Sequence, residues 1–147
     1  MKTLFYLLLA STLLFSCGTQ KEKLQFSEFK IKNENGETGI TVNKNGAIKI
    51  SGEDIGTINS NGTLNDKEGN LLAKMTDDYF LQDKDGNNLI KIDENGKMDN
   101  GSGMFIEWSE SGELLKGNEK TGMSITPVDK NSFQAASIIL FLYLNFE

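Results

Sequence analysis

Short turns that end in glycine recur along this chain, and they constrain its fold more than any other feature. Each has the form Asn/Asp-x-Asn/Asp-Gly. An Asn-Gly or Asp-Gly pair readily takes the positive φ angles of a tight hairpin turn. Each of these turns is therefore a predicted hairpin tip. Five of them occupy residues 33–36, 43–46, 59–62, 83–86 and 93–96.

The segments between these turns predict short strands with one buried face. Several alternate apolar with polar residues, and β-branched or aromatic residues stand at the apolar positions. Regularly spaced short strands of this kind predict a mainly β domain, an antiparallel meander of about eight to ten strands. The clearest strand segments are residues 29–31, 40–42, 48–50, 89–92 and 105–108.

The chain also matches itself. Shifting the sequence by 50 residues superimposes residues 33–62 on residues 83–112 without a gap. The match indicates either an internal duplication or a regular spacing of hairpin turns that both halves share. The identical pairs are Gly36 and Gly86, Ile40 and Ile90, Asn45 and Asn95, Gly46 and Gly96, and Gly62 and Gly112.

The C-terminal segment is apolar on nearly every side and is expected to cover the sheet. Asp129 or Ser132 can cap a helix, and we predict a buried helix at about residues 132–144. A terminal strand over residues 138–146 is the alternative, because periodicity does not distinguish strand from helix in a continuous apolar run. The run is too short to span a bilayer, which favours a core element over membrane insertion.

The first sixteen residues have the pattern of an export signal. Lys2 precedes an apolar run from Leu4 to Leu14. A run of about eleven residues suits a signal peptide and is shorter than the ~20 that a spanning helix needs. The sequence Leu14-Phe15-Ser16-Cys17 follows.

These four residues resemble the lipobox of bacterial lipoproteins, which implies that Cys17 is acylated and anchors the protein to a membrane. Cys17 is the only cysteine. The alternative is an ordinary secretory signal with Cys17 as a bystander. Gly18 stands where an aspartate resembles an inner-membrane retention signal, so an outer-membrane destination is expected, and the Arg-free composition is similar to that of Bacteroidota lipoproteins. No family is identified for the rest of the chain.

The sequence thus divides into three parts. Residues 1–16 are the predicted signal peptide, residues 17–23 a lipidated tether, and residues 24–147 a single β-rich domain with a C-terminal helix. A domain of this length buries enough surface to be stable without disulfides.

Composition argues against several kinds of chemistry. All basic residues are lysine, and the net charge is −6, so a polyanion such as nucleic acid is not an expected partner. The chain has no histidine, the usual proton shuttle near neutral pH and the commonest metal ligand. Residues 83–87 invite a calcium interpretation, but Ile92 stands where an EF-hand loop has its glutamate. We expect no cofactor and no metal ion.

Two acidic and aromatic patches are candidate ligand sites. Glu107 and Glu110 flank Trp108, and Tyr79 follows two aspartates. An aromatic ring beside carboxylates could bind a sugar, and a carboxylate pair at the proper separation could hydrolyse one. Strand alternation argues against both, because it places Trp108 in or near the core and leaves the glutamates in solvent.

By elimination, the sequence indicates a non-enzymatic lipoprotein of the cell envelope. Its expected partners are the membrane, through the N-terminal lipid, and another envelope protein or a surface polymer. The first alternative is glycan or small-ligand binding through Trp108 or Tyr79 and nearby carboxylates. The more remote alternative is a carboxylate-dependent hydrolase.

Overall fold

The structure, a computed structural model, describes residues 23–144. In this range the chain forms twelve strands, a short 3-10 helix η1 (Lys130–Ser132) and an α-helix α1 (Phe133–Leu144). The strands are β1 (Phe29–Lys32), β2 (Thr38–Val42), β3 (Ala47–Ile50), β4 (Glu53–Ile58), β5 (Thr63–Asp66), β6 (Leu71–Met75), β7 (Phe80–Asp83), β8 (Asn88–Ile92), β9 (Met98–Asp99), β10 (Phe105–Trp108), β11 (Glu113–Lys116) and β12 (Glu119–Thr126).

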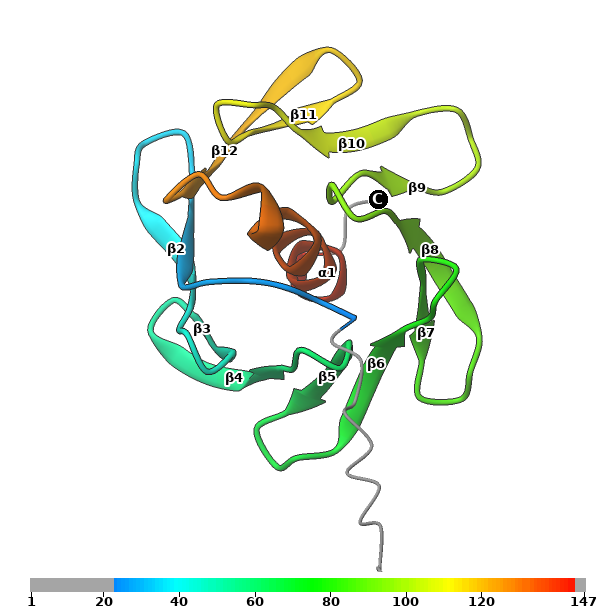
Figure 1. Ribbon diagram of the computed structural model, residues 1–147. Coiled ribbons are helices and arrows are strands. Elements are labelled where there is room, and N and C mark those ends of the chain that lie inside the picture. The colour runs from blue at the N-terminus through cyan, green and yellow to red at the C-terminus, as the bar shows by residue number, and fades with distance from the viewer. Residues whose placement is uncertain (1–22, 145–147) are drawn as a thin grey trace, which may run out of the picture.

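These strands form one closed antiparallel barrel (Figure 1). Each strand pairs with its neighbours in sequence, and β1 pairs with β12, where Ile31 lies opposite Ile125. The predicted antiparallel meander and mainly β class are confirmed. The expected number of eight to ten strands is too low. Some hairpins turn without the repeated motif, as at Ser51-Gly52, and β9 contains only two residues.

The repeating turns differ in detail from tight two-residue turns. In residues 43–46, Gly46 N donates to Asn43 O at 2.9 Å, and Gly46 is the only one of the four residues with a positive φ, 83°. The side-chain oxygen of Asn43 accepts hydrogen bonds from the backbone N of Asn45 and Ala47. This is a three-residue hairpin loop with glycine in the left-handed conformation. Asparagine stabilises the loop through its side chain and not through a positive φ.

The structural unit is a two-stranded hairpin of 16 or 17 residues, which occurs six times around the barrel. Two sets of inward-facing side chains recur at that spacing, and all of them are buried. A shift of 50 residues corresponds to three hairpins, so the internal match superimposes one half of the barrel on the other. The first set is Ile31, Ile48, Leu64, Leu81, Met98 and Leu114, and the second is Val42, Ile58, Met75, Ile92, Trp108 and Ile125.

Helix α1 lies inside the ring of strands (Figure 1). All eight residues from Phe133 to Leu140 are buried, which explains why the segment is apolar on nearly every side. The predicted helix is confirmed, and the alternative strand does not form. The helix covers the apolar face of the sheet, as predicted, and it does so from the inside of a closed barrel. No helix in the described range has the length and apolar character needed to cross a membrane.

Three polar contacts fix how α1 sits in the barrel. Ser137 Oγ donates to the backbone oxygen of Gly96 and accepts a hydrogen bond of 2.9 Å from Trp108 Nε1. Gln134 Nε2 donates to the backbone oxygen of Ile92 at 3.1 Å. The Trp108 ring stacks on Phe133 with centroids 5.6 Å apart. Because buried polar groups are costly without partners, these bonds select one rotation and one depth of the helix.

The turn at Gly96 gives a direct test of this packing. Gly96 has φ +77°, and a Cβ built there would lie 2.5 Å from the backbone oxygen of Phe133. Gly86 has φ +88° but no atom within 4 Å of such a Cβ. We expect Gly86→Ala to cost about 1–2 kcal/mol for the backbone conformation alone. Gly96→Ala is expected to cost about 2–5 kcal/mol, because it also forces the helix away from the turn. Urea unfolding measures both values, and equal losses would contradict the helix contact.

Candidate functional site at the mouth of the barrel

The candidate site lies at the end of the barrel where α1 begins, which we call the mouth. Five loops of the same form surround it, at residues 43–46, 59–62, 76–79, 93–96 and 109–112. Residues 23–28, which we call the strap, cross the mouth in front of α1 (Figure 1). Lys23 N and Leu24 N both donate to Ser60 O, and Ser27 N donates to Ser132 Oγ at 3.1 Å. The strap is therefore bound to a loop on one side and to η1 on the other.

The strap divides the mouth into two clefts, both of which contact Gln25 and Asn131. The first cleft has a volume of about 590 Å³ and the second about 350 Å³. The first is lined by Leu24, Gln25, Phe26, Ser27, Lys44, Asn45, Ile58, Asn59, Ser60, Asp129 and Asn131. The second is lined by Lys23, Gln25, Tyr79, Glu94, Asn95, Lys130, Asn131 and Gln134.

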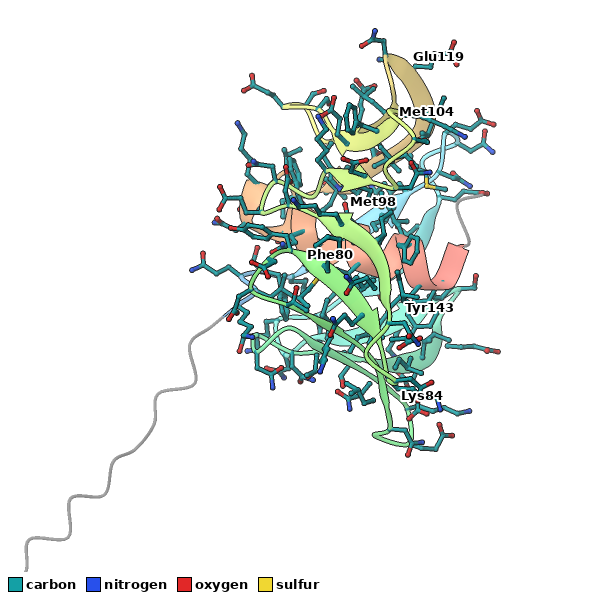
Figure 2. All side chains as sticks on the ribbon, turned by 90° about the vertical axis from the view of Figure 1, so that its right-hand side faces the viewer. Phe80, Lys84, Met98, Met104, Glu119 and Tyr143 are labelled. Carbon is teal, nitrogen blue, oxygen red and sulfur yellow. The ribbon has the colours of Figure 1, made fainter. Side chains whose placement is uncertain are left out.

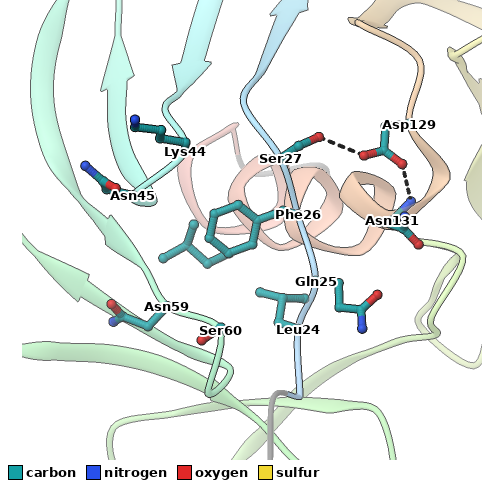
Figure 3. A pocket seen from close by; sticks show the side chains of 11 residues that line it. Leu24, Gln25, Phe26, Ser27, Lys44, Asn45, Asn59, Ser60, Asp129 and Asn131 are labelled. Atoms are coloured by element: carbon teal, nitrogen blue, oxygen red, sulfur yellow. Dashed lines mark hydrogen bonds between the residues drawn. The ribbon is translucent and has the colours of Figure 1, made fainter.

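Amide side chains and one aromatic ring dominate the first cleft. Figure 3 shows the half-buried Phe26 ring pointing into it, toward the loops that carry Asn45 and Asn59. Asp129 is already engaged, because its carboxylate accepts hydrogen bonds from Ser27 Oγ at 2.7 Å and Asn131 N at 3.0 Å. An amide both donates and accepts, so this lining suits ligands rich in hydroxyl groups.

Tyr79 distinguishes the second cleft. It occupies the loop position that glycine holds in the four sister loops, and its φ is +66°. A left-handed conformation costs a non-glycine residue roughly 1–2 kcal/mol, and such residues cluster at functional sites. The side chain is 39% exposed, and its hydroxyl lies 3.4 Å from Glu94 Oε2. The protein thus keeps an exposed aromatic ring at a position where glycine would relieve strain.

The charges around the second cleft are mixed. Lys23 pairs with Asp77 at 2.9 Å, and Lys130 pairs with Glu110 at 3.2 Å. The side chains of Asp77, Lys130 and Glu110 are largely in water and that of Lys23 is 38% exposed, and ion pairs this close to solvent contribute little to stability. The cleft consequently offers both cations and anions to a ligand and selects for neither sign.

The four ligand candidates from the sequence do not form one site. Trp108 is only 8% exposed and lies in the core, bonded to Ser137. Glu107 lies on the outer face of β10, 3.8 Å from Lys97. Glu110 and Tyr79 lie in different loops of the mouth, and of the four only Tyr79 lines a cleft.

Sequence reasoning missed the strap residues Gln25 and Phe26 and the η1 residue Asn131. Their approach depends on β1 meeting β12, a contact across most of the chain. One local signal was available at Tyr79. Residues 76–79 occupy the place of a loop but end in tyrosine instead of glycine.

None of the groups with shifted pKa values, among the described residues, lines a cleft of the mouth. Hydrogen bonds from the side chains and backbones of Asn70 and Asn87 lower the pKa values of Asp66 and Asp83, respectively. The Lys120 ammonium lowers the pKa of Glu113. Burial, and secondarily the charge of Asp66, raises the pKa of Tyr143, near the end of α1. Within residues 23–144, no group of three or more Cys, Asp or Glu side chains is placed to hold a metal ion.

Comparison of the chain with protein-family models, curated proteins and solved structures finds no match.

The buried Trp108 makes a measurable prediction, because it is the only tryptophan in the chain. We expect blue-shifted emission and little quenching by acrylamide, compared with N-acetyltryptophanamide in the same buffer. Ser137→Ala removes the acceptor of the indole N–H and should destabilise the fold by about 1–3 kcal/mol. The matched control Ser102→Ala alters a serine in an exposed loop and should have no effect on stability. Red-shifted, readily quenched emission from the parent protein would contradict the core position.

Proposed function

We propose that the protein is a non-enzymatic lipoprotein of the cell envelope that binds a surface polymer at its mouth. The proposed localisation rests on the signal-like residues 1–16 and on the lipobox resemblance at Cys17. These residues lie outside the described range. The proposed anchor is lipid on Cys17, in the outer membrane, with export by the preceding segment.

The position of Lys23 at the mouth supports a particular orientation of the barrel relative to the membrane. The described residues begin with Lys23 at the mouth, six positions after Cys17. Even fully extended, six residues span only about 20 Å. A lipid on Cys17 would therefore hold the mouth close to the membrane surface. The ends of the hairpins farthest from the mouth would face away from it.

The mouth itself carries the proposal of polymer binding. Two clefts share amide side chains, and each has one aromatic ring, Phe26 or Tyr79. Sugar hydroxyl groups can exchange hydrogen bonds with amides, and an aromatic face can pack on the apolar face of a sugar ring. A glycan is accordingly the polymer class that fits best. The sequence also suggested glycan binding, through Trp108 or Tyr79. The site proposed here retains Tyr79 but has Phe26 in place of Trp108.

Binding fits the arrangement better than hydrolysis does. A glycosidase needs two carboxylates facing one cleft at a defined separation. Glu107 and Glu110 face Lys97 and Lys130, respectively, and neither lines a cleft of the mouth. The two carboxylates that do line these clefts, Asp129 and Glu94, lie in different ones.

The anchor has a direct test. Cys17→Ala should abolish labelling by an alkyne fatty acid and move the protein from the membrane fraction to the soluble envelope fraction, because the acyl chains provide the membrane affinity. Ser11→Ala, inside the apolar run, is the matched control and should stay membrane-bound. Firm membrane association of the Cys17→Ala protein would refute lipid anchoring.

Variants of Tyr79 test the mouth. Tyr79→Gly and Tyr79→Ala both remove the ring, but only glycine relieves the positive φ. We expect Tyr79→Gly to be more stable than Tyr79→Ala by about 1 kcal/mol in urea unfolding. Both should lose roughly tenfold in affinity for immobilised envelope polysaccharides, as expected for truncation of an aromatic contact. Tyr79→Phe should retain most of the affinity.

The matched control for binding is Val128→Ala, which alters an exposed apolar residue outside both clefts. Its affinity should equal that of the parent. Binding that survives Tyr79→Ala, or that falls equally in Val128→Ala, would rule out the second cleft as the polymer site. Recovery of an envelope protein alone with the anchored parent would favour a protein partner instead.

A further inference from the structure

A third cavity lies toward the far end of α1, and we call it the distal slot. It has a volume of about 230 Å³ and is lined by strands β8 to β11, by the loop after β9 and by Phe141 of the helix. Figure 2 shows Met98 and Met104 on this side of the barrel. The slot shares no lining residue with the two clefts of the mouth.

The slot exists because one hairpin is irregular. β9 has two residues and pairs with β10 through only two residue pairs, Asp99 with Phe105 and Met98 with Ile106. A loop containing Gly101 and Gly103, both with positive φ, replaces the compact turn found elsewhere. The β-sheet therefore covers less of α1 at this point than elsewhere, and the space beside the helix is open to solvent.

Most of the residues that line the slot are apolar. Ile90 and Ile106 each stand two positions along their strands from a residue of the buried second set, so their side chains point inward. Met98 and Phe141 lie deeper in the slot, and the exposed Met104, 54% accessible, stands at its rim. Methionine side chains adapt to ligands of different shape.

One positive charge stands among these apolar groups. Lys116 is exposed; it lies two positions from the buried Leu114 on β11 and opposite Ile106 on β10, so its side chain starts from the same side of the barrel wall. It is the only charged residue that lines the slot, in a chain of net charge −6. Asn100, also in the lining, accepts hydrogen bonds from Ser102 through Oδ1, and its Nδ2 can donate to a ligand. A cation and an amide donor beside an apolar wall select an anion with an apolar body.

We propose that the distal slot binds a small anionic amphiphile, a fatty carboxylate of medium chain length free in solution. The carboxylate lies against Lys116 and Asn100, and the alkyl chain packs on Met98, Ile106 and Phe141. A water molecule occupies about 30 Å³ of liquid, so a slot of about 230 Å³ holds about eight groups of that size. Octanoate has eight carbon atoms. The volume of the slot is below the roughly 300–1,000 Å³ of sites for larger ligands.

The probe is octanoate, added to the mature chain with Cys17→Ala so that no lipid or detergent is present. Methyl NMR of methionine reports its position. We expect Met98 and Met104 to shift on titration, while Met75 stays unchanged. Met75 is buried and lines neither the distal slot nor a cleft of the mouth, so it is the internal control. Because the slot and the two clefts share no lining residue, failure of this proposal is distinguishable from failure of the proposed function.

Charge is tested in two ways. Lys116→Gln should weaken octanoate binding roughly tenfold and remove most of its salt dependence. Lys84→Gln is the matched control, because Lys84 is an exposed lysine far from Met104 (Figure 2). Octylamine has the same alkyl chain with the opposite charge and should not shift Met98 or Met104.

The apolar part is tested at the rim, where substitution leaves the core intact. Met104→Ser should weaken binding several-fold, whereas Val128→Ser, at an exposed apolar residue 49% accessible, should not. Three results would each overturn the proposal. These are unshifted Met98 and Met104 at millimolar octanoate, equal binding of octylamine, and equal losses in Lys116→Gln and Lys84→Gln.

Discussion

A ring of twelve strands encloses more space than its own inward side chains can fill, and the rest of the structure depends on that constraint. About eight strands give a barrel that side chains alone can pack. Here the two sets of inward side chains leave the axis of the barrel to α1, which is buried over eight residues. The helix is thus the centre of the core, and the ring has no stable interior without it.

The same constraint determines how closely helix and wall approach. Ala135 and Ala136 are small, and Gly96 brings its loop against the backbone of Phe133. Ser137 then joins the helix to that loop and to Trp108. Rotating or sliding α1 would break these bonds in a place that water does not reach. The start of the helix is consequently fixed against the loops, and η1 and the strap complete the mouth around it.

A filled axis leaves the ends of the barrel as the places where a ligand can be held. At the mouth, the strap creates two polar clefts. Toward the other end, the short β9 leaves an apolar slot with a single lysine. The strain at Tyr79 and the irregular loop after β9 are departures from an otherwise regular repeat. Each departure coincides with a cavity, which is why the two proposals rest on them.

Much of the fold was readable from local patterns. Turn glycines and alternation predicted the hairpins, and alternation also predicted the inward position of Trp108. The 50-residue match reflected the symmetry of the barrel. Local patterns did not reveal the true unit of 16 or 17 residues, because Gly56 and Ala73 interrupt the apolar rhythm and Ser51-Gly52 lacks the common turn form. Of the candidate site, only Tyr79 was identified.

The sequence by itself determined the hairpins, the apolar helix and the order of the elements, since each depends on residues close together in the chain. Tertiary structure decided that the sheet closes, that the helix lies inside it, and that Phe26, Asn131 and Tyr79 meet at one end. Closure joins β1 to β12, and whether distant strands meet depends on the curvature and twist of all the strands between them. No short stretch of sequence encodes the combined curvature and twist of those strands.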